Sequence, residues 1–317
     1  MQAPQHTKTL DIVALGEAMV EFNQTRPGEP HYLQGFGGDT SNAAIAAARA
    51  GAKTAYLTRL GNDLFGDQLL QLWAAEQVDC KGVERDALAH TGVYFVTHGA
   101  EGHAFSYLRA GSAASRMTPD WLAQDAVRNT IASAKVLHVS GISLAISKDA
   151  CRTVFAALQL ARAAHTLVSF DSNLRLKLWP LEEAQNAIPQ AVALCDVFLP
   201  SLEDMQALTG LSAPHAIVDW SHRHGAGKVV LKLGGDGALA SDGSRREHVA
   251  SHRVALVDAT GAGDCFCGNL LARLTHGVDL FTATRYANAA AALAVQGYGA
   301  VAPLPARAQV LNMLKAH

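Results

Sequence analysis

Near the C-terminal end of the chain, residues 257–274 have the sequence VDATGAGDCFCGNLLARL. Small residues lead up to an acid, Asp264, and an apolar, helical pattern follows it directly. Unpaired N–H groups at a helix N-terminus attract an anion, and glycines let backbone amides approach that anion closely. A carboxylate beside such a pocket is useful when a substrate hydroxyl must lose its proton as it attacks phosphorus. The stretch therefore indicates phosphoryl transfer. The alternative is a glycine-rich turn whose acid stabilises the helix dipole.

Two common nucleotide-binding motifs are absent from the sequence. The loop lacks the GxxxxGK[ST] spacing of a P-loop, so no lysine follows its glycines to hold phosphates. No GxGxxG follows the first expected strand, which argues against a dinucleotide-binding fold and hence against a dehydrogenase.

The elements that must position this loop alternate along the chain. Short apolar runs are separated by alanine-rich helical patterns, which predicts a mostly parallel sheet covered by helices on both faces. The expected strands are 10–16, 53–61, 135–141, 166–173, 197–201 and 228–234. The expected helices include 40–52, 63–77, 147–165 and 181–194.

Two segments interrupt the alternation. Residues 18–38 and 90–115 are rich in glycine, aromatic and β-branched residues at period two. This spacing is typical of strands, and we expect antiparallel strands that leave the main sheet and form a small β lid. Because no linker or internal repeat divides the chain, we expect residues 1–317 to form one domain that includes this lid.

Composition excludes several classes of protein. The 317 residues carry a net charge of −2 and 17% charged residues, so there is no basic stripe for nucleic acid. No apolar run reaches the roughly 18 residues that span a bilayer, and the N-terminus lacks the pattern of a secretory leader. The five cysteines form no CxxC pair and suggest a reducing compartment. We therefore expect a soluble cytoplasmic protein that binds neither nucleic acid nor membranes.

Two motifs together resemble a known family. The stretch DATGAGDCFCGNL is similar to the C-terminal motif of the ribokinase-like (PfkB) carbohydrate kinases. Residues 35–66, GFGGDTSNAAIAAARAGAKTAYLTRLGNDLFG, resemble the other motif of that family. The similarity extends from about Ile12 to Pro303. It implies a ribokinase-like three-layer α/β/α domain with a small β lid, and an enzyme that uses ATP and Mg²⁺.

The resemblance also implies roles for individual residues. Asp264 is then the catalytic base, and Gly261, Ala262 and Gly263 form the anion hole. Residues 232–237, KLGGDG, resemble the nucleotide turn of the family. On the sugar side the resemblance places Gly37, Gly38 and Asn42. On the nucleotide side it places Asn173, Arg175, Ser201, Lys232, Gly234, Gly235, Gly237, Gly261, Gly263 and Asn288.

Two arginines bear on the substrate. Tyr107 and Arg109 are two residues apart in an expected lid strand, so their side chains share one face. Arg175 follows an expected strand, at the sheet edge where ligands of open α/β sheets bind. A guanidinium fork matches a carboxylate, which a sugar acid has and a neutral sugar lacks. The alternatives are an ordinary exposed strand residue for Arg109 and a phosphate contact for Arg175.

Three stretches, TGVYF, YLR followed by GSA, and DSNLRLKLWP, resemble the 2-keto-3-deoxygluconate kinase branch of the family. This implies ATP-dependent phosphorylation of 2-dehydro-3-deoxy-D-gluconate to its 6-phosphate. The substrate residues implied are Gly38, Tyr94, Tyr107, Arg109, Arg175 and Asp264. Asp39 and Ala300 depart from the pattern of that branch, and Glu21 keeps a neutral-sugar kinase of the fructokinase or ribokinase type open.

A non-catalytic sugar sensor on the same fold is disfavoured, because a sensor needs neither Asp264 nor the complete glycine loop.

The resemblance also implies a possible site for a monovalent cation, K⁺, beside Asp258 and Thr260, as in ribokinase relatives. The sequence leaves open the oligomeric state, a homo-oligomer included. It also leaves open whether the acid derives from gluconate or galactonate.

Overall fold

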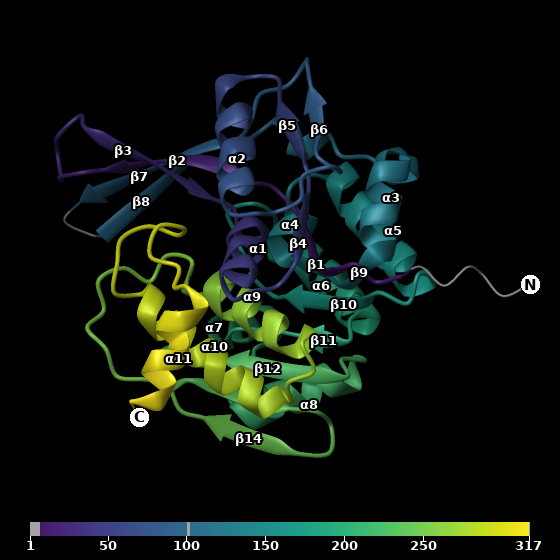
Figure 1. The fold of residues 1–317 in the computed structure, drawn as a ribbon, viewed down its shortest axis with the longest axis vertical. Coiled ribbons are helices and arrows are strands. Elements are labelled where there is room, and N and C mark those ends of the chain that lie inside the picture. Colours follow the sequence, from purple (N-terminus) through teal and green to yellow (C-terminus); the bar gives the residue numbers. More distant parts are fainter. Residues whose placement is uncertain (1–6, 100–101, 317) are drawn as a thin grey trace, which may run out of the picture.

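A large, mostly parallel β-sheet forms the centre of the structure, and helices cover both of its faces (Figure 1). The computed structural model describes residues 7–99 and 102–316. The strands of this sheet are β1 (Leu10–Leu15), β4 (Thr54–Leu57), β9 (Ala134–Ser140), β10 (Leu167–Asp171), β11 (Val197–Phe198), β12 (Lys228–Lys232), β13 (Ala238–Ser241) and β14 (Arg246–Val249). Within the described residues their order is β14-β13-β12-β11-β10-β9-β1-β4. Neighbours are parallel except in the pairs β12–β13 and β13–β14.

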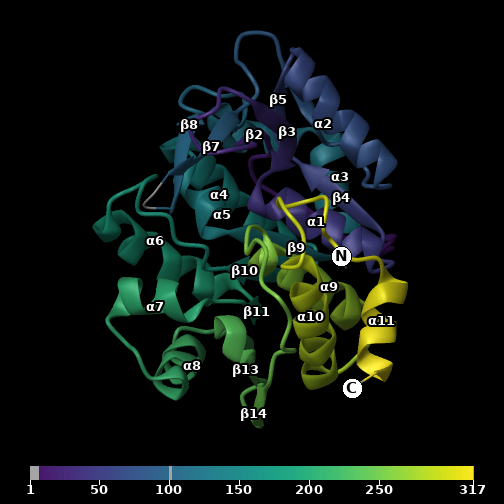
Figure 2. The same cartoon turned by 90° about the vertical axis from the view of Figure 1, so that its left-hand side faces the viewer.

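Separate layers of helices bury the two faces of the sheet. Along β1, Ile12 and Ala14 point into one hydrophobic core, whereas Val13 and Leu15 point into the other. The first core is closed by α1 (Asp39–Arg49), α2 (Leu64–Ala75), α9 (Ala262–Thr275), α10 (Leu280–Ala294) and α11 (Arg307–Lys315). The second is closed by α3 (Asp125–Ser133), α4 (Gly141–Ala145), α5 (Lys148–Ala163), α6 (Leu181–Leu194), α7 (Leu202–Thr209) and α8 (Pro214–Arg223). Figure 2 shows the layers from the side, with α6 to α8 and α9 to α11 on opposite sides of the strands. The predicted three-layer architecture is confirmed.

The expected strands are present with one correction. The run 53–61 is wrong as a single strand, because it divides after Leu57. The first part is β4, and the second is β5 (Arg59–Gly61), which pairs with β6 (Glu84–Asp86) in a separate sheet. Since β1 ends opposite Leu57, the residues beyond it have no partner in the main sheet and pair elsewhere.

A second sheet forms the lid that the sequence predicts. Its strands are β2 (Met19–Gln24), β3 (Tyr32–Gly37), β7 (Val93–Gly99) and β8 (Gly102–Leu108), in the order β3-β2-β7-β8. The expectation of purely antiparallel pairing is wrong, because β2 and β7 are parallel. The hairpin β2–β3 returns the chain to the main sheet, so β7 leaves it again in the same direction as β2. Three short 3-10 helices complete the described elements: η1 (Ala114–Arg116), η2 (Pro119–Ala123) and η3 (Gly234–Asp236).

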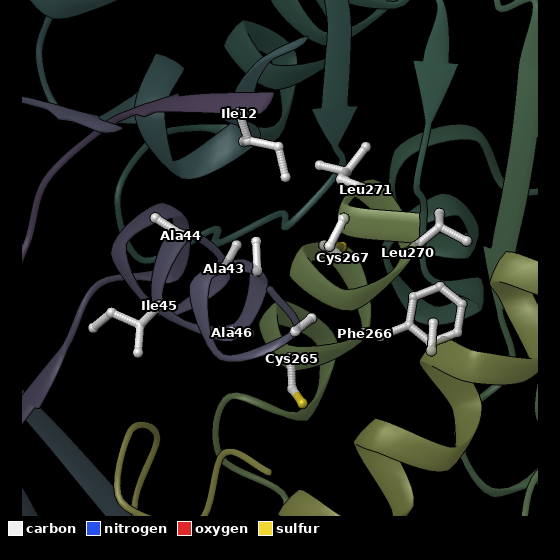
Figure 3. Close-up of a cluster of buried hydrophobic side chains, with 14 of the residues drawn as sticks. Ile12, Ala43, Ala44, Ile45, Ala46, Cys265, Phe266, Cys267, Leu270 and Leu271 are labelled. Carbon is white, nitrogen blue, oxygen red and sulfur yellow. The ribbon is translucent and has the colours of Figure 1, made fainter. Parts of the chain in front are cut away.

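The helices α1 and α9 pack closely against each other beneath the lid. Figure 3 shows Ala43 and Ala46 of α1 next to the part of α9 that carries Cys265 and Cys267. A Cβ on Gly268 of α9 would overlap the carbonyl oxygen of Ala43. Only glycine therefore allows this approach, which brings the N-terminal turns of the two helices together.

Candidate active site

A cavity of about 1100 Å³ opens at the carboxyl ends of β10 and β12. Its walls come from those strand ends, from the lid, and from the first turns of α1 and α9. This is the edge at which ligands bind in open α/β sheets. Predicted site residues that line it are Gly38, Asn42, Tyr94, Tyr107, Arg109, Asn173, Arg175, Ser201, Lys232, Gly234, Gly235, Gly237, Thr260, Gly261, Ala262, Gly263, Asp264 and Asn288.

Two predicted residues, both within the described part of the chain, lie outside the cavity wall. Gly37 lies behind the ring of Tyr94, and a Cβ there would overlap the tyrosine hydroxyl. Asp258 binds its own loop and a second one: its carboxylate accepts hydrogen bonds from Thr260 N and Oγ1, at 2.9 and 2.7 Å, and from Gly299 N at 2.9 Å. The monovalent cation beside Asp258 and Thr260 stays a prediction.

The glycine loop forms the N-terminus of α9. Gly261 precedes the helix with a φ of 72°, and a Cβ there would lie 3.1 Å from Ala300 Cα. This left-handed conformation beside a neighbouring backbone requires glycine. The first amides of α9 have no partner within the helix and carry the positive end of its dipole, so they can bind an anion.

Asp264 lies in the first turn of this helix and is half-buried. Its Oδ2 accepts a hydrogen bond from Asn42 Nδ2 over 2.8 Å. Burial and then the neighbouring Asp39 raise the pKa of Asp264 to about 7, against the opposing effects of Asn42 and Lys232. A carboxylate with a pKa near neutrality is suited to take up a proton during catalysis.

A second buried acid lies beside the base. Asp39 begins α1, and its Oδ2 accepts a hydrogen bond from Asn173 Nδ2 over 3.0 Å. Burial raises the pKa of Asp39, and the charge of Asp171 adds to this effect. Asn173 has a φ of 25°, which is unusual for a residue other than glycine. This strained turn directs its amide at Asp39.

On the lid side, two carboxylates hold the predicted substrate residues. Tyr94 donates its hydroxyl to Glu21 over 2.5 Å. Arg109 forms an ion pair with Glu17, and the exposed fractions of the two side chains are 10% and 1%. Ser112 Oγ donates to the other oxygen of Glu17 over 2.5 Å. The guanidinium group of Arg109 thus lines the cavity with a buried counter-ion already at one end.

The nucleotide side is built from turns and helix ends. Residues 234–236 form η3, and Gly237 follows with a φ of 94°. Ser201 caps α7, because its hydroxyl accepts from Asp204 N over 3.1 Å. Asn288 Nδ2 donates to the carbonyl groups of Val249 and Ala250 at 2.9 and 3.2 Å. These contacts fix the backbone around this part of the cavity.

Several cavity residues were missed by sequence reasoning. Glu17, Asp171 and Asp204 line the cavity but were not among the predicted site residues. Glu17 and Asp171 lie at the carboxyl ends of β1 and β10, so the sheet-edge rule could have identified them. Phe105 of β8 also lines the cavity, two residues before Tyr107 on the same strand face.

Two negative findings apply to the described residues. Within residues 7–99 and 102–316, no cluster of three or more His, Cys, Asp or Glu side chains could hold a metal ion. In the same part of the chain, no helix combines the length and apolarity needed to cross a membrane.

A half-buried carboxylate, a helix-terminal anion loop and a glycine-rich turn that line one cavity are the features of a phosphotransferase site. Residues 9–307 match the pfkB family carbohydrate kinase, and the chain belongs to this family. It is 34% identical to a 2-dehydro-3-deoxygluconokinase of Thermoproteus tenax over 316 residues, which cover 97% of this chain and 95% of the relative. It is also 34% identical to a probable fructokinase-4 of Arabidopsis thaliana, with 99% of each chain covered. A structure of Vibrio cholerae fructokinase with bound fructose, ADP and calcium superposes with a TM-score of 0.85 at 32% identity, and covers 96% of this chain and 99% of that one.

Proposed function

We propose that the protein transfers the γ-phosphoryl group of ATP to 2-dehydro-3-deoxy-D-gluconate and forms the 6-phosphate. The observation that carries this proposal is that Arg109 and Arg175 line the same cavity as Asp264. A planar guanidinium group can bind the acid group of the substrate in a bidentate manner. The relative from Thermoproteus tenax supports this choice.

The residues suggest how the transfer proceeds. The terminal hydroxyl of the substrate gives its proton to Asp264, and its oxygen attacks the γ-phosphorus in line with the ADP oxygen that leaves. Loop amides of residues 261–263 bind the charge that spreads over the phosphoryl oxygens. The lid residues Tyr94 and Tyr107 cover the cavity and limit the access of water.

Mg²⁺ fits the carboxylates of this cavity. Mg²⁺ is usually bound by one or two protein carboxylates together with the substrate phosphates, so a preformed protein cage is not required. Asp204 lines the nucleotide side of the cavity, where its Oδ2 accepts from Ser172 Oγ over 2.7 Å. We infer that Asp204 would hold the ion, which neutralises phosphate charge when bound.

A neutral-sugar kinase is the second candidate, and one observation favours it. Because Glu17 neutralises the buried Arg109, that arginine could serve to anchor the lid instead of binding a carboxylate. The chain is 34% identical both to the probable fructokinase-4 of Arabidopsis thaliana and to the 2-dehydro-3-deoxygluconokinase of Thermoproteus tenax.

A coupled assay of ADP release with Mg²⁺ and ATP decides between these candidates. The panel contains 2-dehydro-3-deoxy-D-gluconate, the galactonate-derived acid, fructose and ribose, with a reaction lacking acceptor as blank. We expect the gluconate-derived acid to give the highest kcat/KM. A higher kcat/KM for fructose or ribose contradicts the proposed substrate. Binding of a sugar by calorimetry without any acceptor-dependent ADP release would instead support a sensor.

A single domain, a cytoplasmic location and a monovalent cation beside Asp258 and Thr260 remain predictions of the sequence.

A further inference from the structure

A lysine lies against the anion loop, although the sequence of the loop contains none. Lys232 ends β12, and a Cβ placed on Gly263 would lie 3.6 Å from its Nζ. Both residues line the main cavity together with Asp264. A phosphoryl group held by the loop amides would therefore come within reach of this ammonium group.

A carboxylate fixes the position of the ammonium group. Lys232 Nζ donates to Oδ1 and Oδ2 of Asp171, both over 2.8 Å, and lies 3.6 Å from Cys267 Sγ. The lysine side chain is 14% exposed and that of Asp171 is 4% exposed. Burial alone would lower the pKa of Lys232, but the charge of Asp171 and its hydrogen bonds raise it above its ordinary value. The group therefore stays charged.

Stability is a weak explanation for such a pair, because the cost of burying two charges offsets most of their attraction. The negative charge of the cavity wall is a stronger explanation for the presence of Lys232. Asp39, Asp171, Asp204 and Asp264 all line the cavity, and without cations beside them these carboxylates would repel a triphosphate. Phosphoryl transfer needs fixed positive charge at the oxygens of the moving group, and Lys232 lies beside the loop that would bind them.

We propose that Lys232 is a catalytic residue whose ammonium group binds the oxygens of the transferring phosphoryl group, while Asp171 acts as its positioning residue. The inference rests on the proposed kinase activity. As the acceptor oxygen bonds to the γ-phosphorus, the bond from that phosphorus to the ADP oxygen breaks and the acceptor proton moves to Asp264. Lys232 keeps its proton throughout. A P-loop places such a lysine directly after its glycines. Here the lysine lies at the end of β12, far from the glycine loop in the sequence.

The first test compares Lys232→Met with Lys135→Met. Lys135 also lies on the main sheet and pairs with an aspartate, Asp11, over 2.7 Å, but it is outside the cavity wall. We expect Lys232→Met to lower kcat about 10²- to 10³-fold, the usual cost of losing one oxyanion donor, with a nearly unchanged KM for ATP. Lys135→Met should keep the wild-type kcat. A kcat of Lys232→Met within about threefold of wild type would overturn the proposal.

A double variant separates catalysis from charge compensation. Lys232→Met leaves the Asp171 carboxylate buried without its partner, which by itself destabilises the fold. Asp171→Asn/Lys232→Met removes both charges. We expect the double variant to recover thermal stability and to remain slow, and Asp171→Asn alone to be faster than Lys232→Met. Recovery of kcat by the double variant would show that Lys232 only neutralises Asp171.

A binding measurement tests the same point without turnover. ADP with aluminium fluoride imitates the transferring phosphoryl group, and transition-state analogues report contacts that form during the reaction. By calorimetry, Lys232→Met should lose affinity for ADP–aluminium fluoride by a factor similar to its loss in kcat, and should bind ADP alone like wild type. If the proposed acid is not a substrate, the kinetic tests use the acceptor that the panel identifies, and this titration is run with that acceptor. Equal affinity of both proteins for the analogue would contradict a role for Lys232 in the transfer.

Discussion

Asn42 Nδ2 donates a hydrogen bond to Asp264 Oδ2 over 2.8 Å and so joins the first turns of α1 and α9. This bond favours the charged carboxylate, whereas burial and Asp39 favour the protonated acid. The balance of these effects raises the pKa of Asp264 to about 7. The close packing of α1 against α9 thus sets the proton affinity of the proposed base.

This balance predicts the pH dependence of the reaction. Asp264 must be ionised to accept a proton, so kcat/KM should fall as the pH drops below about 7. Asn42→Ala removes the bond that lowers this pKa, and the acid limb should move to higher pH. Asn269→Ala serves as the control, because it removes a buried asparagine of α9 that donates to the carbonyl oxygen of Cys265 and not to Asp264. A profile that is flat down to about pH 5 would contradict the role of Asp264.

Asp264→Asn should remove the base and leave the site otherwise intact. The amide keeps an oxygen that can accept from Asn42, so the fold and the affinity for ATP should be retained. We expect kcat to fall about 10²- to 10⁴-fold, the usual contribution of a positioned general base. Steady-state ADP release and calorimetry with ATP measure the two effects. Turnover within about threefold of wild type would show that another group takes the proton.

The same substitution should stabilise the fold at alkaline pH. The folded-state pKa of about 7 lies above the ordinary value of 3.8, so above pH 7 the folded protein holds an ionised carboxylate that its surroundings disfavour. This destabilisation fades as the pH falls from 7 toward 3.8. In thermal melts, Asp264→Asn should exceed the wild-type Tm at about pH 8 and approach it near pH 4. An unchanged difference in Tm across this range would mean that the titration of Asp264 does not affect stability.

The sequence predicts the fold well where physical signals are local. The alternation of apolar runs and helical patterns locates β1, β9, β10 and β12, because buried parallel strands are short and continuously apolar. The break after Leu57 could not be predicted in this way. It depends on where the neighbouring strand β1 ends, which is a property of the pairing and not of the run itself.

The site is predictable in part for the same reason. The glycine loop and Asp264 have a local pattern, so their chemistry can be inferred before the structure is known. The Glu17–Arg109 ion pair joins residues that are far apart in the chain, and nothing in the local sequence of either indicates the other. The parallel pairing of β2 with β7 likewise depends on the path of the chain between them.

Gly268→Ala tests the packing of the two helices beneath the site. The new Cβ would overlap the carbonyl oxygen of Ala43, so α1 and α9 must move apart. Overpacking of this kind costs about 1–3 kcal/mol of unfolding free energy, which denaturant titration can measure. Because the movement also separates Asn42 from Asp264, kcat/KM should fall as well. Gly235→Ala, where a Cβ meets no atom within 4 Å, is the control for stability. Equal stability of the two variants would contradict the packing argument.

A test of whether Arg109 binds the carboxylate of the substrate must also remove the charge of its buried partner, Glu17. Arg109→Ala alone would leave Glu17 as an unpaired buried charge and disturb the fold. The double variant Glu17→Gln/Arg109→Gln removes both charges and keeps similar side-chain sizes. If Arg109 binds the acid group, the double variant loses a charge-assisted contact of about 1.5–3 kcal/mol. This loss corresponds to a roughly 10- to 150-fold decrease in kcat/KM for the sugar acid, with an unchanged KM for ATP.

Glu17→Gln alone keeps the guanidinium group and should not raise the KM for the acid, and a neutral sugar should respond little to either change. An unchanged KM for the acid in the double variant would leave Arg175 as the remaining candidate, and Arg175→Gln should then show the loss. If neither arginine affects the KM for the acid, or if both variants affect acid and neutral sugar alike, the cavity does not select a carboxylate and the neutral-sugar kinase is the correct interpretation.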